Sequence, residues 1–240
     1  MPRQPRLALP GIALHIIQRG NNRGICFSGD TDYLCYLAYL RQFSQKYRCA
    51  VHAYCLMTNH VHILATPLEP DSCTGLMRDL GQSYVKYFNR RYDRTGTLWE
   101  GRYRSCVVES SSYVLACYRY VELNPVRAGM VHHPSAYAWS SYAVNAGFNV
   151  DPLVTPHPEY LAIAASLNRR YVDYRRLLDG GVDEVTRTAI RDATNSSLPL
   201  CSDAFKAKLQ AGGRKVGHLR PGPQPAAVKA EDALQLKIVL

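Results

Sequence analysis

The nine residues Leu56-Met57-Thr58-Asn59-His60-Val61-His62-Ile63-Leu64 combine a turn with two closely spaced histidines. Side chains along a β-strand alternate between its two faces, so a strand that begins at His60 would present His60 and His62 on the same face. The preceding apolar run, Cys49–Met57, predicts a partner strand, with Thr58-Asn59 as the connecting turn. Two imidazoles held on one strand face can bind a divalent cation through their neutral ring nitrogens.

A second informative stretch, Tyr120-Val121-Glu122-Leu123-Asn124-Pro125, lies downstream. Residues four positions apart share a helix face, so a helix here would place Tyr120 and Asn124 one turn apart. The serines at 110–112 predict the start of that helix, and the proline predicts its end or a bend. A metal-binding pair on a strand and a tyrosine on a helix together indicate attack on a phosphodiester.

Hydrophobic periodicity predicts the other elements of the chain. The expected strands cover residues 15–20, 25–27, 49–57, 60–65 and 105–108, and the expected helices cover residues 31–47, 72–92 and 113–123. This order indicates an α+β fold in which helices pack on one face of an antiparallel sheet. The sequence has no GxGxxG turn and no GxxxxGK[ST] motif, so a nucleotide cofactor is not expected.

The chain divides into three parts by composition. Residues 1–147 hold the motifs above and are expected to form one domain. Prolines between positions 152 and 158 mark a linker into helical segments, so residues 148–210 are expected to form a helical C-terminal extension. Residues 211–240 are basic and rich in proline and glycine, which predicts a flexible tail.

Charge and cysteine content narrow the class of protein. The chain has 240 residues and a formal net charge of +10, which favours a polyanionic partner, although a basic surface without a partner would look the same. No apolar run is long enough to span a membrane and the N-terminus lacks a signal core, so we expect a cytoplasmic protein with no membrane partner. The eight cysteines form no CxxC pair, which predicts reduced thiols in the core rather than structural zinc.

With these motifs, the sequence resembles the REP-associated tyrosine transposases, a group within the single-tyrosine HUH transposases. The resemblance covers about residues 10–145. It rests on four blocks in order: His15-Ile16-Ile17-Gln18-Arg19-Gly20-Asn21-Asn22-Arg23, Met57-Thr58-Asn59-His60-Val61-His62, Gly96-Thr97-Leu98-Trp99-Glu100-Gly101-Arg102-Tyr103, and Tyr120-Val121-Glu122-Leu123-Asn124-Pro125-Val126-Arg127-Ala128-Gly129.

This resemblance implies a ferredoxin-like HUH nuclease fold and a role for each motif residue. His60 and His62 would hold Mg²⁺ or Mn²⁺, and Asn124 matches the polar residue that completes the metal site. Tyr120 matches the nucleophile that nicks and rejoins single-stranded DNA through a 5′-phosphotyrosine. The implied substrate is repeat-derived DNA that folds into a hairpin, and the group favours a monomer over a dimer. By ligand type alone, two imidazoles and an amide oxygen suit Mn²⁺ somewhat better than Mg²⁺.

Basic and aromatic residues near these blocks are candidates for DNA contact. The candidate phosphate contacts are Arg19, Arg23, Lys86, Arg90, Arg91, Arg102 and Arg104. Tyr87, Trp99 and Tyr103 could stack on unpaired bases, although core packing is the alternative. In the tail, Arg214, Lys215 and Arg220 could contact a hairpin stem or only keep the protein in solution.

Other residues near the motifs are expected to be structural. Tyr113 and Tyr118 are rivals of Tyr120 as a nucleophile, but we expect them to pack in the core. Glu122 falls off the Tyr120 face of the helix and is expected on the surface. His15 and His52 are expected to be buried or sheet-face residues rather than metal ligands.

Three other functions fit the same residues less well. A non-catalytic nucleic-acid-binding module would not need the intact histidine pair and tyrosine. A hydrolytic metallonuclease would use water as the nucleophile and leave no covalent protein–DNA adduct. A rolling-circle initiator or plasmid relaxase shares the histidine pair, but the short chain and the absence of a helicase motif disfavour it.

Overall fold

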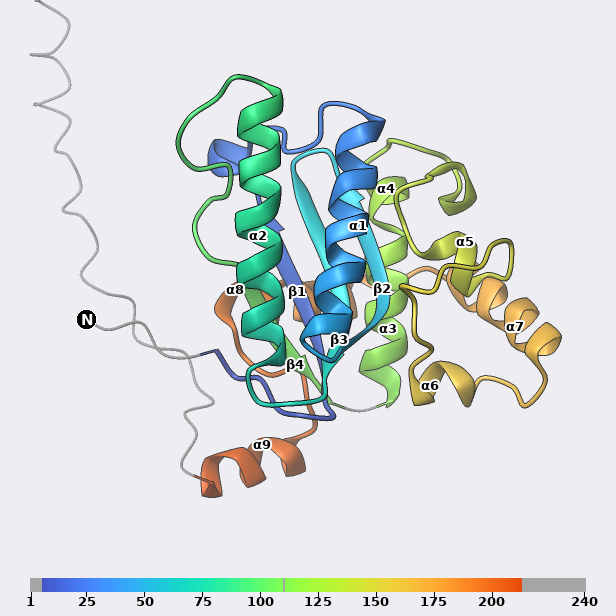
Figure 1. Ribbon diagram of the computed structural model, residues 1–240. Helices are drawn as coiled ribbons and strands as arrows, with labels where there is room; N and C mark the ends of the chain where they lie inside the picture. The colour runs from blue at the N-terminus through green and yellow to red at the C-terminus, as the bar shows by residue number, and fades with distance from the viewer. Residues whose placement is uncertain (1–5, 110, 213–240) are drawn as a thin grey trace, which may run out of the picture.

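A four-stranded antiparallel sheet forms the centre of the molecule (Figure 1). This computed structural model describes residues 6–109 and 111–212. The strand order across the sheet is β2-β3-β1-β4, and every pairing is antiparallel. The strands are β1 (Ala13–Arg19), β2 (Cys49–Met57), β3 (His60–Pro67) and β4 (Arg104–Val108).

Helices follow the strands in a β–α–β–β–α–β order, which confirms the expected α+β architecture with a helical C-terminal region. The long helices of this unit are α1 (Asp30–Lys46), α2 (Ser72–Arg91) and α3 (Ser111–Glu122). Shorter elements are η1 (Asn21–Arg23), α4 (Asn124–Arg127), η2 (Pro134–Ala136), α5 (Tyr142–Asn145) and α6 (Pro158–Leu161). The C-terminal helices are α7 (Leu167–Asp179), α8 (Glu184–Ser196) and α9 (Asp203–Ala211).

One predicted strand, over residues 25–27, is not formed. The backbone N–H groups of Cys26 and Phe27 both donate to the carbonyl of Thr58, and both side chains are buried. The segment therefore closes over the β2–β3 turn as a connection into α1. The apolar side chains of Cys26 and Phe27 reflect that burial rather than a strand, whereas Ile25 is exposed.

Helices cover both faces of the sheet, so the prediction of helices on one face was wrong. α1 and α2 lie over one face, and α3 and α8 lie over the other (Figure 1). The reason is visible in β3, where successive residues from Val61 onward are all buried. A strand whose side chains are apolar on both faces needs cover on both sides.

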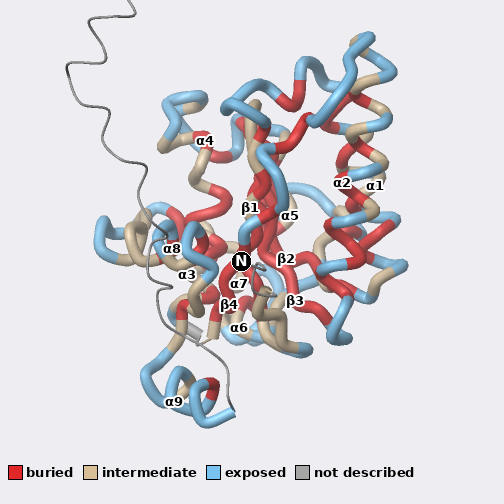
Figure 2. Tube along the Cα trace, turned by 90° about the vertical axis from the view of Figure 1, so that its left-hand side faces the viewer, coloured by how far each residue is buried: buried red, intermediate tan, exposed pale blue. Residues whose placement is uncertain are grey.

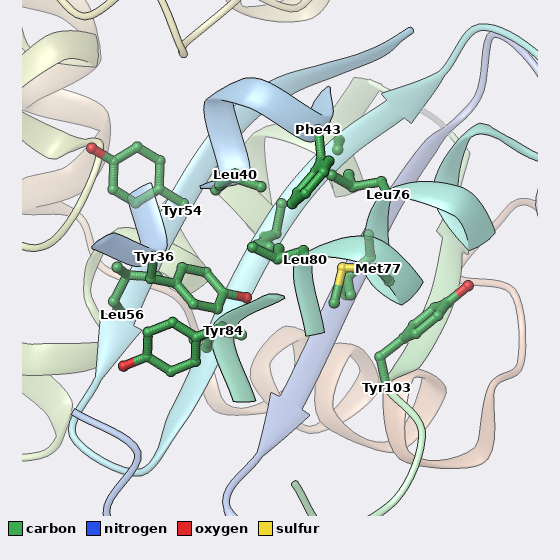
Figure 3. Packing of buried hydrophobic residues seen from close by; sticks show 14 of the residues in the cluster. Tyr36, Leu40, Phe43, Tyr54, Leu56, Leu76, Met77, Leu80, Tyr84 and Tyr103 are labelled. Carbon is green, nitrogen blue, oxygen red and sulfur yellow. The ribbon is translucent and has the colours of Figure 1, made fainter. Parts of the chain in front are cut away.

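The first core lies between the sheet and the α1–α2 pair. Figure 3 shows Tyr36 and Leu40 of α1 packed against Leu80 and Tyr84 of α2 above Leu56 of β2. All five side chains are fully buried. Figure 2 shows the same pattern as buried strands with helices that are exposed on their outer sides.

The second core lies between the opposite face and α3, and the C-terminal helices belong to it. Tyr174 of α7, Ile190 of α8 and Leu200 are buried there. The N–H of Leu200 donates to the carbonyl of Val107 at 2.7 Å, so this segment also pairs with the edge of β4. Pairing of an exposed strand edge satisfies its free backbone groups.

All eight cysteines are free thiols, and six of them are buried, as expected. Among the described residues, no helix is long and apolar enough to cross a membrane. The predicted flexible tail lies almost wholly outside the described residues, and its candidate DNA contacts Arg214, Lys215 and Arg220 lie entirely outside them.

Candidate active site

β3 places the two histidines of the motif on the face of the sheet that α3 covers. His60 and His62 pair with Arg19 and Ile17 of β1, and Met57 pairs with His60 across the Thr58-Asn59 turn. The imidazole centroids of His60 and His62 lie 4.9 Å apart with a 75° angle between the rings. The two rings are therefore neighbours, as the strand alternation predicted.

Tyr120 of α3 packs against His62 of this pair, and against His15, within the same chain. Its ring centroid lies 5.7 Å from that of His62 and 5.5 Å from that of His15, in edge-to-face geometry. The structure thus brings the predicted nucleophile to the predicted metal ligands. Tyr118 is fully buried on another side of α3 and Tyr113 is partly buried, which agrees with core packing.

Hydrogen bonds fix the ring nitrogen that each motif histidine offers to the site. His60 Nδ1 lies 2.7 Å from Asn59 Oδ1, and Asn59 Nδ2 donates to the carbonyl of Arg23 at 3.0 Å. Because a backbone carbonyl can only accept, the Asn59 amide oxygen faces His60, and His60 Nδ1 carries the proton. The Nε2 atom of His60 therefore keeps its lone pair.

A longer chain of hydrogen bonds does the same for His62. His62 Nδ1 lies 3.0 Å from His15 Nε2, and His15 Nδ1 lies 2.8 Å from Thr194 Oγ1. Thr194 Oγ1 donates to the carbonyl of Ile190 at 2.7 Å. It then accepts from His15 Nδ1, so His15 Nε2 accepts from His62 Nδ1, and His62 Nε2 is left unprotonated.

Burial keeps these imidazoles neutral. It lowers the pKa of His60 to about 4 and that of His15 to about 3. The pKa of His62 lies well below its usual value because of burial first, and then because of the neighbouring His60 and His15. Neutral imidazoles are the form that binds a metal ion.

The donor set fits a divalent cation. Two neighbouring rings offer unprotonated Nε2 atoms, and each ring donates its other N–H, which is the usual arrangement of metal-binding histidines. Within residues 6–109 and 111–212, no group of three or more His, Cys, Asp or Glu side chains could hold a metal ion. Any further ligand must come from an amide, a hydroxyl, water or the substrate, which matches Mg²⁺ or Mn²⁺ better than structural zinc.

Asn124 lies close to Tyr120 but has no hydrogen bond to either histidine. α3 ends at Glu122 and α4 begins at Asn124, so the helix breaks near Pro125 as expected. The Asn124 amide donates to the carbonyls of Tyr120 and Val121, and its Oδ1 accepts from Arg127 at 2.7 Å. Asn124 therefore stays a predicted ligand with one remaining lone pair on Oδ1.

Arg127 is a site residue to which the sequence analysis assigned no role. Its guanidinium lies 4.4 Å from the Tyr120 ring centroid and donates to the Tyr120 carbonyl at 2.8 Å. Its Nη1 atom is buried and has no hydrogen-bond partner among the described residues. Burial raises the pKa of Tyr120, and the positive charge of Arg127 is the largest effect in the opposite direction.

The predicted DNA-binding residues separate into two groups. Arg19, Arg102 and Arg104 line one surface pocket with Asn195 of α8, and Arg19 pairs with His60 across the strands. Arg23 lies exposed in η1 beside Asn59. By contrast, Lys86, Arg90 and Arg91 lie on α2, which covers the other face of the sheet, and Arg91 forms an ion pair with Asp32 at 3.6 Å.

Two expectations about nearby side chains need correction. Trp99 and Tyr103 are buried in the first core, so they have no free ring face for a DNA base. Tyr87 is partly buried and donates to the Asp32 carboxylate. Glu122 is fully buried rather than on the surface, because Ser141, Asn145 and Tyr174 donate hydrogen bonds to it.

Comparisons with known proteins identify a matching family model and a similar fold. A sequence model of the family described as IS200-like transposase matches residues 8–124. The fold is similar to a solved structure of a REP-associated tyrosine transposase bound to a REP hairpin, with 16% identity and a TM-score of 0.51 over 66% of this chain and 93% of that chain. A proposed transposase from Deinococcus radiodurans matches at 20% identity with a TM-score of 0.36, over 46% of this chain and 89% of that one. No curated protein matches.

The matched residues include the histidine pair, the tyrosine and the asparagine, and end before the C-terminal helices. The fold similarity at 16% identity independently supports the same architecture. Over residues 8–124, the chain is therefore similar to the IS200-like transposases.

Proposed function

We propose that this protein nicks and joins single-stranded DNA in a metal-dependent reaction, with Tyr120 as the nucleophile and a repeat-derived hairpin as the substrate. The observation that carries the proposal is the packing of Tyr120 against His62, which with the neighbouring His60 offers an unprotonated Nε2 atom. The hairpin is inferred from the similar transposase, whose solved structure contains a REP hairpin.

The chemistry is a transesterification. The Tyr120 oxygen forms a bond to the scissile phosphorus, the bond from phosphorus to the 3′ oxygen breaks, and its electron pair stays on that oxygen. The phenol loses one proton and the departing 3′ oxygen gains one, so charge and atoms balance. The product is a 5′-phosphotyrosine and a free 3′-OH, which can attack in the reverse direction and join strands without ATP.

His60 and His62 would hold Mg²⁺ or Mn²⁺, with Asn124 as the proposed third ligand. A cation bound there would stabilise negative charge on the scissile phosphate. Arg127 adds a fixed positive charge beside the Tyr120 ring, where it stabilises the phenolate that develops during attack. Its unpaired Nη1 is a further donor for a phosphate oxygen.

We also propose that one chain is sufficient for the reaction. Tyr120 and His62 meet within the chain, and no residue from a second copy is needed to complete the pair. A monomer is therefore the simplest active form. Arg19, Arg23, Arg102 and Arg104 are the proposed phosphate contacts, because they surround the His60 end of the sheet.

The test is a denaturing-gel assay with end-labelled single-stranded oligonucleotides that contain hairpins, in the presence of Mn²⁺ or Mg²⁺. Wild-type protein should give a slowly migrating covalent adduct. Tyr120→Phe should bind the hairpin but give no adduct, because only the hydroxyl is lost. Tyr113→Phe, a second tyrosine on α3, is the matched control and should give wild-type adduct.

His60→Ala should abolish metal-dependent cleavage in the same assay. Adduct formation by Tyr120→Phe would show that another residue is the nucleophile. Cleavage without an adduct in both proteins would indicate a hydrolytic nuclease. Binding of a cognate hairpin without cleavage would indicate a non-catalytic module.

A further inference from the structure

The chain of hydrogen bonds behind His62 crosses from the matched transposase domain into the C-terminal helices. Thr194 lies on α8, and 179 positions separate it from His15, to which it is bonded. The side chains of His15, His62 and Thr194 are each at least 98% buried. Water therefore cannot easily replace a lost partner in this chain.

Thr194 sets the donor-to-acceptor direction of this series of hydrogen bonds. The Thr194 hydroxyl lies 2.7 Å from the carbonyl oxygen of Ile190, a distance between two oxygens that requires a proton between them. Its oxygen is then an acceptor for His15 Nδ1. Cys106 Sγ lies 3.2 Å from the same oxygen and can donate to it as well.

Reversal of this direction would place a proton on the wrong nitrogen of His62. If His15 lost its acceptor at Nδ1, its proton could move to Nε2, which faces His62 Nδ1 at 3.0 Å. His62 Nδ1 would then have to accept, and the proton of the neutral ring would lie on Nε2. That nitrogen is the one needed for a metal ion.

We propose that Thr194, acting through His15, is a positioning residue that holds the proton of His62 on Nδ1 and so keeps Nε2 free for a divalent cation. The inference rests on the proposed function for its metal ion, although the proton position itself is a property of the metal-free protein. It assigns a role in the active site to α8, which lies outside the residues matched by the family.

The hydrogen-bond acceptors behind His62 and His60 differ in their distance along the sequence. The acceptor of His60 is Asn59, its neighbour in sequence, whereas the acceptor of His62 depends on a helix that must dock on the sheet. α8 packs against β4 and β1, and β1 carries His15. Docking of α8 therefore completes the surroundings of His62.

The experiment uses the full chain with three α8 variants. Thr194→Val keeps the shape of the side chain but removes the hydroxyl, whereas Thr194→Ser keeps the hydroxyl. Thr188→Val is the matched control, because it removes a hydroxyl from the same helix that donates to Glu184 rather than to the chain behind His62. Urea unfolding of each variant confirms that the comparison is made between folded proteins.

The first measurement is nitrogen-15 NMR of labelled histidines in the metal-free protein at pH 8, with assignment by His15 and His62 substitution. Wild type, Thr194→Ser and Thr188→Val should show His62 protonated at Nδ1, and Thr194→Val should show protonation at Nε2. An unchanged His62 signal in folded Thr194→Val overturns the proposal.

The second measurement is the affinity for Mn²⁺ in the absence of DNA. The electron paramagnetic resonance signal of free Mn²⁺ reports binding in this titration. Thr194→Val should bind Mn²⁺ about 10- to 100-fold more weakly than wild type, the usual effect of losing a partner behind a metal ligand, and Thr194→Ser should remain close to wild type. Equal affinity in Thr194→Val and wild type also overturns the proposal. Wild type that binds no Mn²⁺ overturns the metal assignment of the proposed function, whereas the NMR result judges the role of Thr194 separately.

Discussion

Replacement of Glu122 by glutamine should change how the stability of this protein depends on pH. Glu122 lies two residues after Tyr120 on α3, and its carboxyl group is fully buried. Ser141, Asn145 and Tyr174 donate to it at 2.5, 2.7 and 2.6 Å. Burial raises its pKa from 4.5 to about 7, although the three donors act in the opposite direction.

The direction in which stability changes with pH follows from proton binding by the folded and unfolded states. Between pH 4.5 and about 7 the folded protein keeps the Glu122 proton, whereas the unfolded chain releases it. The stabilisation linked to this proton is full below pH 4.5 and is lost as the pH rises through about 7. The shift corresponds to about 3 kcal/mol, of which about 2 to 3 kcal/mol falls between pH 5 and pH 8.

Glutamine has nearly the same shape but does not titrate. Its oxygen can accept from Ser141 and Asn145, and its amide group can donate to the Tyr174 hydroxyl once that hydroxyl rotates. The free energy of unfolding of Glu122→Gln minus that of wild type should therefore rise by about 2 to 3 kcal/mol from pH 5 to pH 8. The difference is needed because buried histidines such as His15, with lowered pKa values, change stability in the opposite direction.

This difference is measured by urea unfolding at pH 5 and pH 8, with tryptophan fluorescence as the probe of unfolding. Glu100→Gln is the control, because the Glu100 side chain is exposed to solvent and its removal should change the pH dependence little. If Glu122→Gln and wild type show the same pH dependence, the three donors keep Glu122 ionised throughout, and the argument from burial is wrong.

Two further predictions concern the charges around the site. Arg127→Met should shift the pH profile of adduct formation to higher pH, because the charge that lowers the pKa of Tyr120 is removed; a profile that does not move would exclude this role. The logarithm of hairpin affinity should fall with the logarithm of salt concentration. Arg104→Gln should make this slope less steep by about 0.7 to 0.9, the value for one lost phosphate contact. Arg90→Gln, on the helix over the opposite face, should leave the slope unchanged, and equal effects of both variants in a fluorescence-anisotropy titration would contradict the proposed DNA path.

Local patterns were sufficient to predict most of the sheet. The strand Cys49–Met57 and the start of β3 at His60 were predicted with the bounds that the structure has, because a turn and unbroken apolar runs define both ends. The placement of both motif histidines on one face followed from strand alternation alone. The family resemblance implied that Tyr120 and the histidine pair share a site, but it left open whether the two come from the same chain, since no spacing rule links residues on separate elements.

Contacts between residues far apart in the sequence could not be predicted from local patterns. Glu122 was expected at the surface because it falls off the Tyr120–Asn124 face of the helix, whereas its burial depends on partners as distant as Tyr174. Trp99 and Tyr103 are compatible with either a core or a base-stacking role until the packing of α2 is known. The apolar run at residues 25–27 predicts a strand, but Cys26 and Phe27 are instead buried over a turn, which needs the same kind of side chain.

The surroundings of the two motif histidines also depend to different degrees on long-range partners. Each needs an acceptor behind its ring, and the acceptor of His60 is adjacent in sequence, whereas the chain behind His62 ends on α8. Loss of the Thr194 hydroxyl would leave His15 Nδ1 buried without a partner, which costs about 1 to 3 kcal/mol unless the proton moves to Nε2 of His15. That move changes the nitrogen that His62 presents to the site. On the proposed role of Thr194, the active site includes a residue of α8, beyond residues 8–124 that match the family model.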